Sequence, residues 1–154
     1  MIYFLDIDGV VVPAKAWKNP EFLNDGFPDF SSKAISILQR LLSEEDTIML
    51  TTSHKSKFSI KEWENIFKTR GLNIKNIHSL PENIKSLTRK DEIINWFNTN
   101  IINDDFVIID DDKSLNDLPA FLKANLVLTS SHIGLTEEHF EVIKSLSHNK
   151  NHTT

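Results

Sequence analysis

Short apolar runs that stop abruptly at polar residues constrain the fold of this chain most. The clearest run is residues 106–109, Phe-Val-Ile-Ile, which leads directly into Asp110 and two further aspartates. Continuous apolar runs of this length, rich in β-branched and aromatic residues, are typical of strands buried on both faces of a parallel sheet. The same pattern predicts strands at residues 2–5, 48–50 and 126–128, and a weaker one at 74–77.

Between these runs, apolar residues recur at helical spacing. Residues 32–43 and 59–70 each carry one apolar face, which predicts two amphipathic helices. Thr88 is placed to cap a third helix through Phe97, and Thr136 to cap a last one. Strands that alternate with helices imply right-handed crossovers and helices on both faces of the sheet. We therefore expect an α/β fold, a Rossmann-like three-layer domain with a mostly parallel sheet of about five strands.

The size and composition are those of one globular domain. The chain has 154 residues, of which 40% are hydrophobic and 25% charged, and it contains no cysteine. Disulfides, thiolate metal sites and cysteine nucleophiles are therefore excluded. We expect one domain over residues 1–147 and a polar tail over 148–154. The apolar run at 2–5 is too short for a signal peptide or a membrane span, so we expect a cytoplasmic protein with no membrane partner.

The net charge limits the kinds of partner. The formal charge is −5, with no cluster of lysines and arginines. Strong non-specific binding to nucleic acid needs a basic excess, so we do not expect it here. A small groove that holds a single phosphate end remains compatible with this charge. The sequence sets no oligomeric state.

Polar side chains follow three of the predicted strands. Asp6 and Asp8 follow the first, Thr51 follows the second, and Asp110 and Asp111 follow the strand at 106–109. The carboxyl ends of parallel strands share one edge of the sheet, so these residues should converge. Two carboxylates about 5 Å apart repel by roughly 3 kcal/mol at an effective dielectric of 20, and a divalent cation among them would offset this repulsion. Oxygen ligands without cysteine favour Mg²⁺ over zinc.

These residues resemble the motifs of the haloacid dehalogenase-like (HAD) superfamily of phosphohydrolases, over nearly the whole chain. Residues 6–9, Asp-Ile-Asp-Gly, are similar to the Asp-x-Asp-Gly signature of the family. Thr51 is similar to its second-motif hydroxyl residue, Lys90 to its third-motif lysine, and residues 106–111 to its fourth-motif strand with paired acids. The four motifs stand in the order that the family shows.

The resemblance implies a catalytic role for each of four residues. Asp6 would attack phosphorus and form an aspartyl-phosphate, and Asp8 would act as general acid and then general base. Thr51 would donate a hydrogen bond to a phosphoryl oxygen, and Lys90 would place a positive charge beside it. The second aspartate of the signature marks phosphoester chemistry, because the dehalogenases lack it. A phosphomonoesterase is therefore the expected activity.

The resemblance also implies the metal ligands. Asp110 and Asp111 would complete a Mg²⁺ shell together with Asp6 and the main-chain carbonyl of Asp8. Cap domains of this superfamily follow the first or the third motif. Residues 13–31, with three prolines, are long enough only for a flap. We therefore expect no cap domain and an open site.

More narrowly, the chain is similar to the HAD domains of multifunctional RNA-repair proteins. The similarity lies in the start of the chain, in residues 51–54, in the paired acids and in residues 134–136. His54 stands where those domains tend to have an aromatic residue. The resemblance implies a phosphorylated substrate, a nucleic-acid end or another bulky phosphoester.

Several assignments stay open at this stage. Thr52 or Ser53 could replace Thr51 as the donor, and Lys85 or Arg89 could replace Lys90. His54 could contact substrate or be an ordinary surface histidine.

Two other functions also stay open. A non-catalytic phosphoacceptor or phosphate-binding module, similar to a receiver domain, would use a similar set of residues. In receivers, however, the acid pair follows the first strand and the lysine comes last, whereas here Lys90 precedes Asp110. A phosphotransferase would use the same residues as a phosphatase, with an acceptor other than water.

Overall fold

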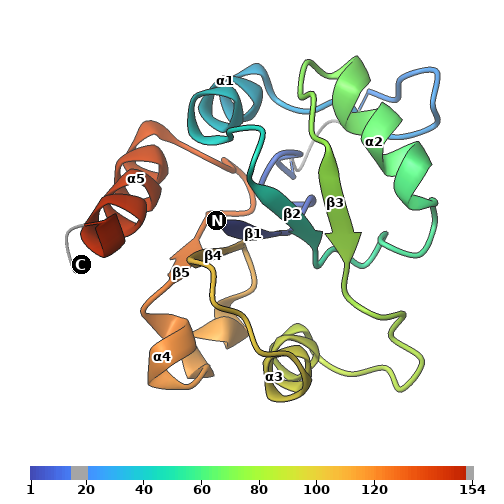
Figure 1. Ribbon diagram of the computed structural model, residues 1–154. Helices are drawn as coiled ribbons and strands as arrows, with labels where there is room; N and C mark the ends of the chain where they lie inside the picture. The colour runs from blue at the N-terminus through green and yellow to red at the C-terminus, as the bar shows by residue number, and fades with distance from the viewer. Residues whose placement is uncertain (15–20, 152–154) are drawn as a thin grey trace.

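A parallel sheet lies at the centre of the computed structural model, which describes residues 1–14 and 21–151 (Figure 1). Within this part of the chain the sheet has five strands in the order β3-β2-β1-β4-β5, and every neighbouring pair is parallel. The strands are β1 (Ile2–Leu5), β2 (Thr47–Leu50), β3 (Asn76–Ser79), β4 (Phe106–Asp110) and β5 (Leu126–Leu128). The chain runs from β1 outward to β3 and then restarts at β4 on the other side of β1, so the strand order reverses between β1 and β4.

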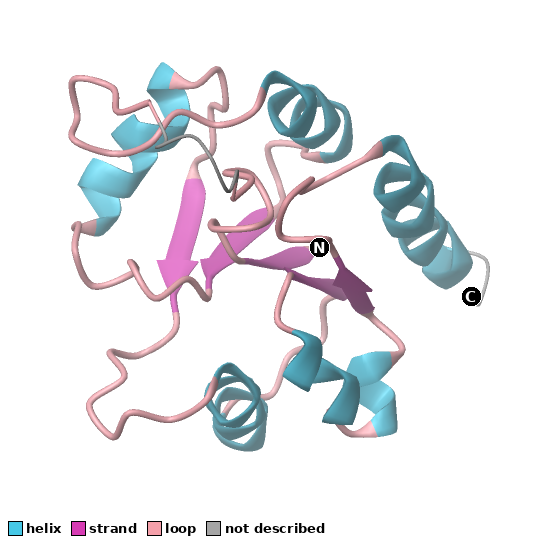
Figure 2. Ribbon diagram, turned by 180° about the vertical axis from the view of Figure 1, so that it is seen from behind, coloured by secondary structure: helices cyan, strands magenta, loops and turns pink. Residues whose placement is uncertain are grey.

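Helices cover both faces of the sheet, as the two opposite views show (Figures 1 and 2). One face is covered by α1 (Ser32–Leu41), α2 (Ile60–Thr69) and α5 (Glu137–Asn151). The other face is covered by α3 (Arg89–Thr99), the 3₁₀ helix η1 (Lys113–Asp117) and α4 (Ala120–Lys123). The predicted three-layer α/β architecture is therefore confirmed.

The pleat of β1 divides the core into two parts. Tyr3 and Leu5 pack with α1, α2 and α5, whereas Phe4 packs with α3, η1 and α4. All three side chains are buried, because a central parallel strand has helices on both of its faces. This accounts for the continuous apolar run at the start of the sequence.

The ends of the helices follow from local hydrogen bonding. Ser59 and Glu62 form a capping box at the start of α2, and the Thr88 side chain accepts a hydrogen bond from the backbone N–H of Asp91 at the start of α3. Thr88 is thus the N-cap that the sequence predicts. Its position fixes where α3 begins, directly beside the carboxyl edge of the sheet.

Some boundaries differ from the prediction. The third strand begins at Asn76, two residues later than predicted, because Ile77 pairs with Ile48 and sets the register. η1 and α4, between β4 and β5, were not predicted, since both are too short to show a helical period. α5 continues to Asn151, beyond residue 147, the predicted end of the domain. The division into a domain and a tail stays a prediction. None of the described helices has the length and apolar character needed to cross a bilayer.

Candidate active site

Acidic residues from two neighbouring strands meet at the carboxyl edge of the sheet. Asp6 directly follows β1, its backbone N–H donates to the carbonyl of Ile109 at 3.1 Å, and Asp110 is the last residue of β4. Carboxylate oxygens of Asp6, Asp110 and Asp111 all lie within 4.8 Å of one another. Residues about a hundred positions apart therefore form one cluster, at the point where the strand order reverses.

Burial gives this cluster unusual electrostatics. Asp6 and Asp110 are almost completely buried. Removal from water, together with the nearby negative charge of Asp110, raises the pKa of Asp6 to about 8, although the Arg89 guanidinium opposes the shift. Burial also raises the pKa of Asp111. The ionised forms of these carboxylates therefore need a nearby positive charge for stabilisation, and Arg89 offsets the cost of burial only in part.

Arg89 provides the positive charge inside the cluster. Its Nη1 lies 2.7 Å from Oδ2 of Asp110 and 3.4 Å from Oδ1 of Asp6. The other oxygen of Asp110, Oδ1, accepts hydrogen bonds from the backbone N–H groups of Asp111 and Asp112 at 2.8 and 3.0 Å. Asp110 is thus held on both sides.

The side chain of Lys90, the predicted basic residue, makes no ion pair or hydrogen bond with any described residue, and the same is true of the Lys85 side chain. Arg89, which the sequence left as an alternative, is the one whose charged group enters the cluster. Arg89 and Lys90 are consecutive at the start of α3, and successive side chains on a helix point about 100° apart. The assignment of Lys90 stays a prediction, and Arg89 is the basic residue that contacts Asp6 and Asp110.

The turn after β1 brings Asp111 close to the backbone. Gly9 has a φ of +78°, and a Cβ built there would meet Oδ2 of Asp111 at 2.0 Å. Thr129, just past β5, donates from its hydroxyl to the carbonyl of Gly9 at 2.7 Å. Glycine is therefore needed at this position both for its backbone conformation and for its lack of a side chain. Thr129 follows a predicted strand just as Thr51 does, but it matches no family motif, so the sequence did not predict it as part of the site.

Asp8 lies apart from the three buried acids. Its side chain is 57% exposed, and its Oδ2 lies 2.7 Å from Nε2 of His54. The described group of close carboxylates contains Asp6, Asp110 and Asp111 but not the Asp8 carboxylate. This position outside the cluster suits a proton donor and acceptor. The predicted metal contact of Asp8 runs through its main-chain carbonyl and stays a prediction.

Thr51 carries a buried hydroxyl with no partner. It follows β2, and its backbone N–H donates to the carbonyl of Leu5 at 3.1 Å. Its Oγ1 is the buried side-chain atom that lacks a hydrogen bond among the described residues. The alternatives differ from it, because the Thr52 hydroxyl accepts a bond from the backbone N–H of His54 and Ser53 is exposed. An orphaned buried hydroxyl is costly unless a ligand satisfies it, which favours Thr51 as the donor.

The comparison with known families agrees with this geometry. The family model for the HAD domain in Swiss Army Knife RNA repair proteins matches residues 2–140. This chain belongs to that HAD family. The match spans every strand of the sheet and all the acids described above, so the resemblance predicted from the sequence is confirmed. Among curated proteins, no match was found.

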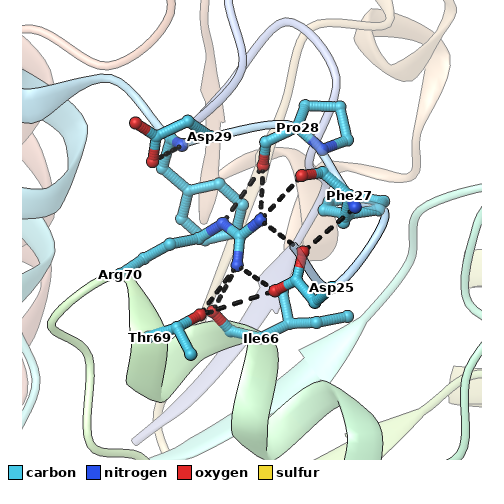
Figure 3. A network of polar contacts seen from close by, with 8 residues as sticks. Asp25, Phe27, Pro28, Asp29, Ile66, Thr69 and Arg70 are labelled. Atoms are coloured by element: carbon cyan, nitrogen blue, oxygen red, sulfur yellow. Dashed lines mark hydrogen bonds and ion pairs between the residues drawn. The ribbon is translucent and has the colours of Figure 1, made fainter. Parts of the chain in front are cut away.

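This HAD domain has no cap among its described residues. Of the predicted flap, residues 13–31, the stretch 15–20 lies outside the described part, and the stretch 21–31 contains no helix. Arg70, at the end of α2, holds the latter stretch in place (Figure 3). Its guanidinium donates to the Asp25 carboxylate at 2.6 and 3.1 Å and to the carbonyls of Phe27 and Pro28 at 2.9 and 2.8 Å. The described flap is thus fixed against the domain.

Proposed function

We propose that this HAD domain is a Mg²⁺-dependent phosphomonoesterase that works through an aspartyl-phosphate on Asp6. The observation that carries the proposal is the meeting of Asp6, Asp110 and Asp111 within 4.8 Å, with Arg89 between two of them. Belonging to a HAD family of RNA repair proteins supports a function in phosphoester chemistry.

The donor set fits a magnesium ion. Asp6 and Asp111 offer carboxylate oxygens whose ionised form is disfavoured by burial, and a divalent cation would restore that form. All the donors are hard oxygens, which magnesium prefers. Asp6, Asp110 and Asp111 would hold the ion, together with the carbonyl of Asp8. When bound, Mg²⁺ would neutralise charge that develops on the phosphoryl oxygens.

Asp6 and Asp8 divide the reaction between them. A carboxylate oxygen of Asp6 forms a bond to phosphorus while the bond from phosphorus to the leaving oxygen breaks. Asp8 gives its proton to that oxygen. Water then attacks the phosphorus of the aspartyl-phosphate, Asp8 takes the proton of the water, and the Asp6 carboxylate is released. The exposed position of Asp8, outside the buried cluster, is compatible with both proton transfers.

Two further groups would stabilise the phosphoryl group during transfer. The unpartnered hydroxyl of Thr51 would donate to one of its oxygens. Arg89 lies 3.4 Å from Asp6 and would place a positive charge beside the oxygen that attacks. Lys90 remains the alternative for this charge.

The substrate we propose is a terminal phosphate on a nucleic acid. The family description places related domains in RNA repair proteins, which supports a nucleic acid as the substrate. The net charge of −5 offers no broad basic surface, so recognition would be limited to the end and its phosphate. The absence of a cap among the described residues leaves room for a long chain to approach.

A phosphatase screen tests the proposal. Oligonucleotides with 3′ or 5′ phosphates, mononucleotides, sugar phosphates and phosphopeptides are incubated with the protein and Mg²⁺, and released phosphate is measured. We expect release from the oligonucleotides, loss of release with EDTA, and loss in Asp6→Asn. The matched control is Asp112→Asn, since Asp112 lies outside the cluster and an asparagine can still accept the bond from Ser114 that caps η1. Turnover by Asp6→Asn at the wild-type rate would contradict the proposal.

A further inference from the structure

His54 makes a direct contact with Asp8. Its Nε2 lies 2.7 Å from Oδ2 of Asp8, and the two residues come from the loops after β2 and β1. An ionised Asp8 has no proton to donate, so it can be contacted only through an Nε2–H of His54. The other oxygen of Asp8, Oδ1, has no hydrogen bond from any described residue. The contact therefore occupies one oxygen, and no described residue occupies the second one.

His54 is itself held on two sides. Its backbone N–H donates to the hydroxyl of Thr52 at 3.2 Å. Its ring packs edge-to-face with Phe27, with centroids 5.5 Å apart and planes at 86°. Phe27 is buried and also packs edge-to-face against Trp63 and Phe58. A histidine with these constraints loses little further freedom when it binds a carboxylate.

The flap completes this support. The backbone N–H of Phe27 donates to Oδ1 of Asp25 at 3.0 Å, and its carbonyl accepts from Arg70 at 2.9 Å. Figure 3 shows Arg70 between Asp25 and the carbonyls of Phe27 and Pro28. The line of contacts thus runs from α2 through Phe27 and His54 to Asp8.

We propose that His54 is a positioning residue for Asp8, which rests on the phosphatase function proposed above. By holding Oδ2, it fixes the rotamer of an exposed side chain that would otherwise sample several. It directs Oδ1 to the leaving oxygen in the first step and to water in the second. The proton passes between Asp8 and these oxygens, and His54 neither gains nor loses one.

Leaving groups of different basicity test this role. An alkyl phosphate needs a proton on its leaving oxygen, whereas a p-nitrophenyl phosphate releases a stable phenolate with little help. We compare kcat/KM, which reports the steps up to transfer onto Asp6 and not the later hydrolysis. In His54→Ala we expect a loss of about 10- to 100-fold for the alkyl ester and less than about threefold for the aryl ester. In an Asp8→Ala background the same substitution should add no further loss.

Conservative and control variants separate positioning from stability. His54→Gln keeps an N–H donor near the position of Nε2 and should recover part of the lost alkyl activity. His78→Ala removes an exposed histidine on β3 and should leave both substrates unaffected. Without metal or substrate, NMR of the imidazole should show an Nε2–H proton that exchanges slowly with water in the wild type, because it is bonded to Asp8. The same proton should exchange faster in Asp8→Ala.

The outcomes distinguish this inference from the function on which it rests. A wild-type protein that releases no phosphate from any ester contradicts the phosphatase proposal and the role of His54 together. A wild type that turns over, with His54→Ala losing equal activity on alkyl and aryl esters or none on either, overturns only the positioning role.

Discussion

Gly9 and Asp111 lie so close together that no side chain fits between them. A Cβ on Gly9 would meet Oδ2 of Asp111 at 2.0 Å and its carboxyl carbon at 2.5 Å. The glycine of the first motif thus determines where an acid of the fourth motif can lie. Their proximity links the geometry of the turn after β1 directly to the proposed metal site.

Gly9→Ala should therefore displace Asp111 and weaken Mg²⁺ binding. We expect turnover to fall by about tenfold or more, because a displaced Asp111 would no longer hold the cation in the correct position beside the phosphoryl group. Gly26→Ala is the matched control, since Gly26 has the same φ of +78° but nothing within 4 Å of its Cβ position. That variant should lose only about 1–2 kcal/mol of stability from backbone strain. Equal Mg²⁺ affinity in the two variants, measured by calorimetry, would contradict the account.

Thr51→Val should separate activity from stability. The hydroxyl of Thr51 is buried without a hydrogen bond, so its replacement by a methyl group should leave the free energy of unfolding unchanged or raise it by about 1 kcal/mol. The rate of phosphate release should fall about tenfold or more. Thr129→Val, which removes the bond to Gly9, should instead lower stability by about 1–3 kcal/mol. Chemical denaturation and kinetics of both variants check this, and a large loss of stability in Thr51→Val would be evidence of a purely structural hydroxyl.

Arg89 and Lys90 can be told apart by substitution. Arg89→Ala leaves the buried Asp110 without its cation and should lower stability by about 3–5 kcal/mol. Arg89→Lys keeps the charge, so it should fold better than Arg89→Ala while still losing activity. Lys90→Ala should change stability by less than about 0.5 kcal/mol and turnover by less than about threefold. A larger loss of turnover in Lys90→Ala than in Arg89→Lys would instead favour Lys90 as the residue that places a positive charge beside the phosphoryl group.

The raised pKa of Asp6 predicts how stability depends on pH without metal. The folded pKa of about 8 lies above the ordinary value of 3.8 that holds in the unfolded chain. Between these values the folded protein keeps a proton that the unfolded chain loses, so stability should fall as pH rises, by at most about 1.4 kcal/mol per unit for this group. Mg²⁺ must displace that proton, so its stabilising effect should grow over the same window.

Thermal unfolding in EDTA and in Mg²⁺, from pH 5 to about pH 8, measures both effects. Asp6→Asn should make the stability of the metal-free protein depend less on pH, and it should remove most of the stabilisation by Mg²⁺. Asp104→Asn, which changes an exposed acid, should alter neither. A metal-free trend that is the same in the wild type and in Asp6→Asn would show that Asp6 ionises in the fold as it does in the unfolded chain.

The acids and the sheet were predictable from the sequence, because three of the apolar runs stop at residues of the proposed site. Asp6 and Asp110 end buried strands, and parallel pairing then brings them together without further information. The choice between Arg89 and Lys90 was not predictable in this way. Both stand at the start of α3, and only the packing of that helix decides which side chain faces Asp110.

Contacts between distant segments were also beyond the reach of sequence patterns. The pair of Arg70 with Asp25 joins α2 to the flap across 45 positions, and neither residue stands in a motif. His54 was recognised as a neighbour of the site, but its partner Asp8 comes from another loop. Such contacts depend on how loops fold back over the sheet edge, which no local periodicity encodes.

Detection of a phosphoryl group on Asp6 would test the central claim most directly. Asp8→Asn lacks the base for the second step, so it should accumulate the intermediate when given Mg²⁺ and an aryl phosphate, which needs little proton donation. After an acid quench, mass spectrometry of the protein should show one added phosphoryl group, mapped to Asp6 and absent when Asp6 is asparagine. A phosphoryl group on another residue, or full activity in Asp6→Asn, would contradict the account.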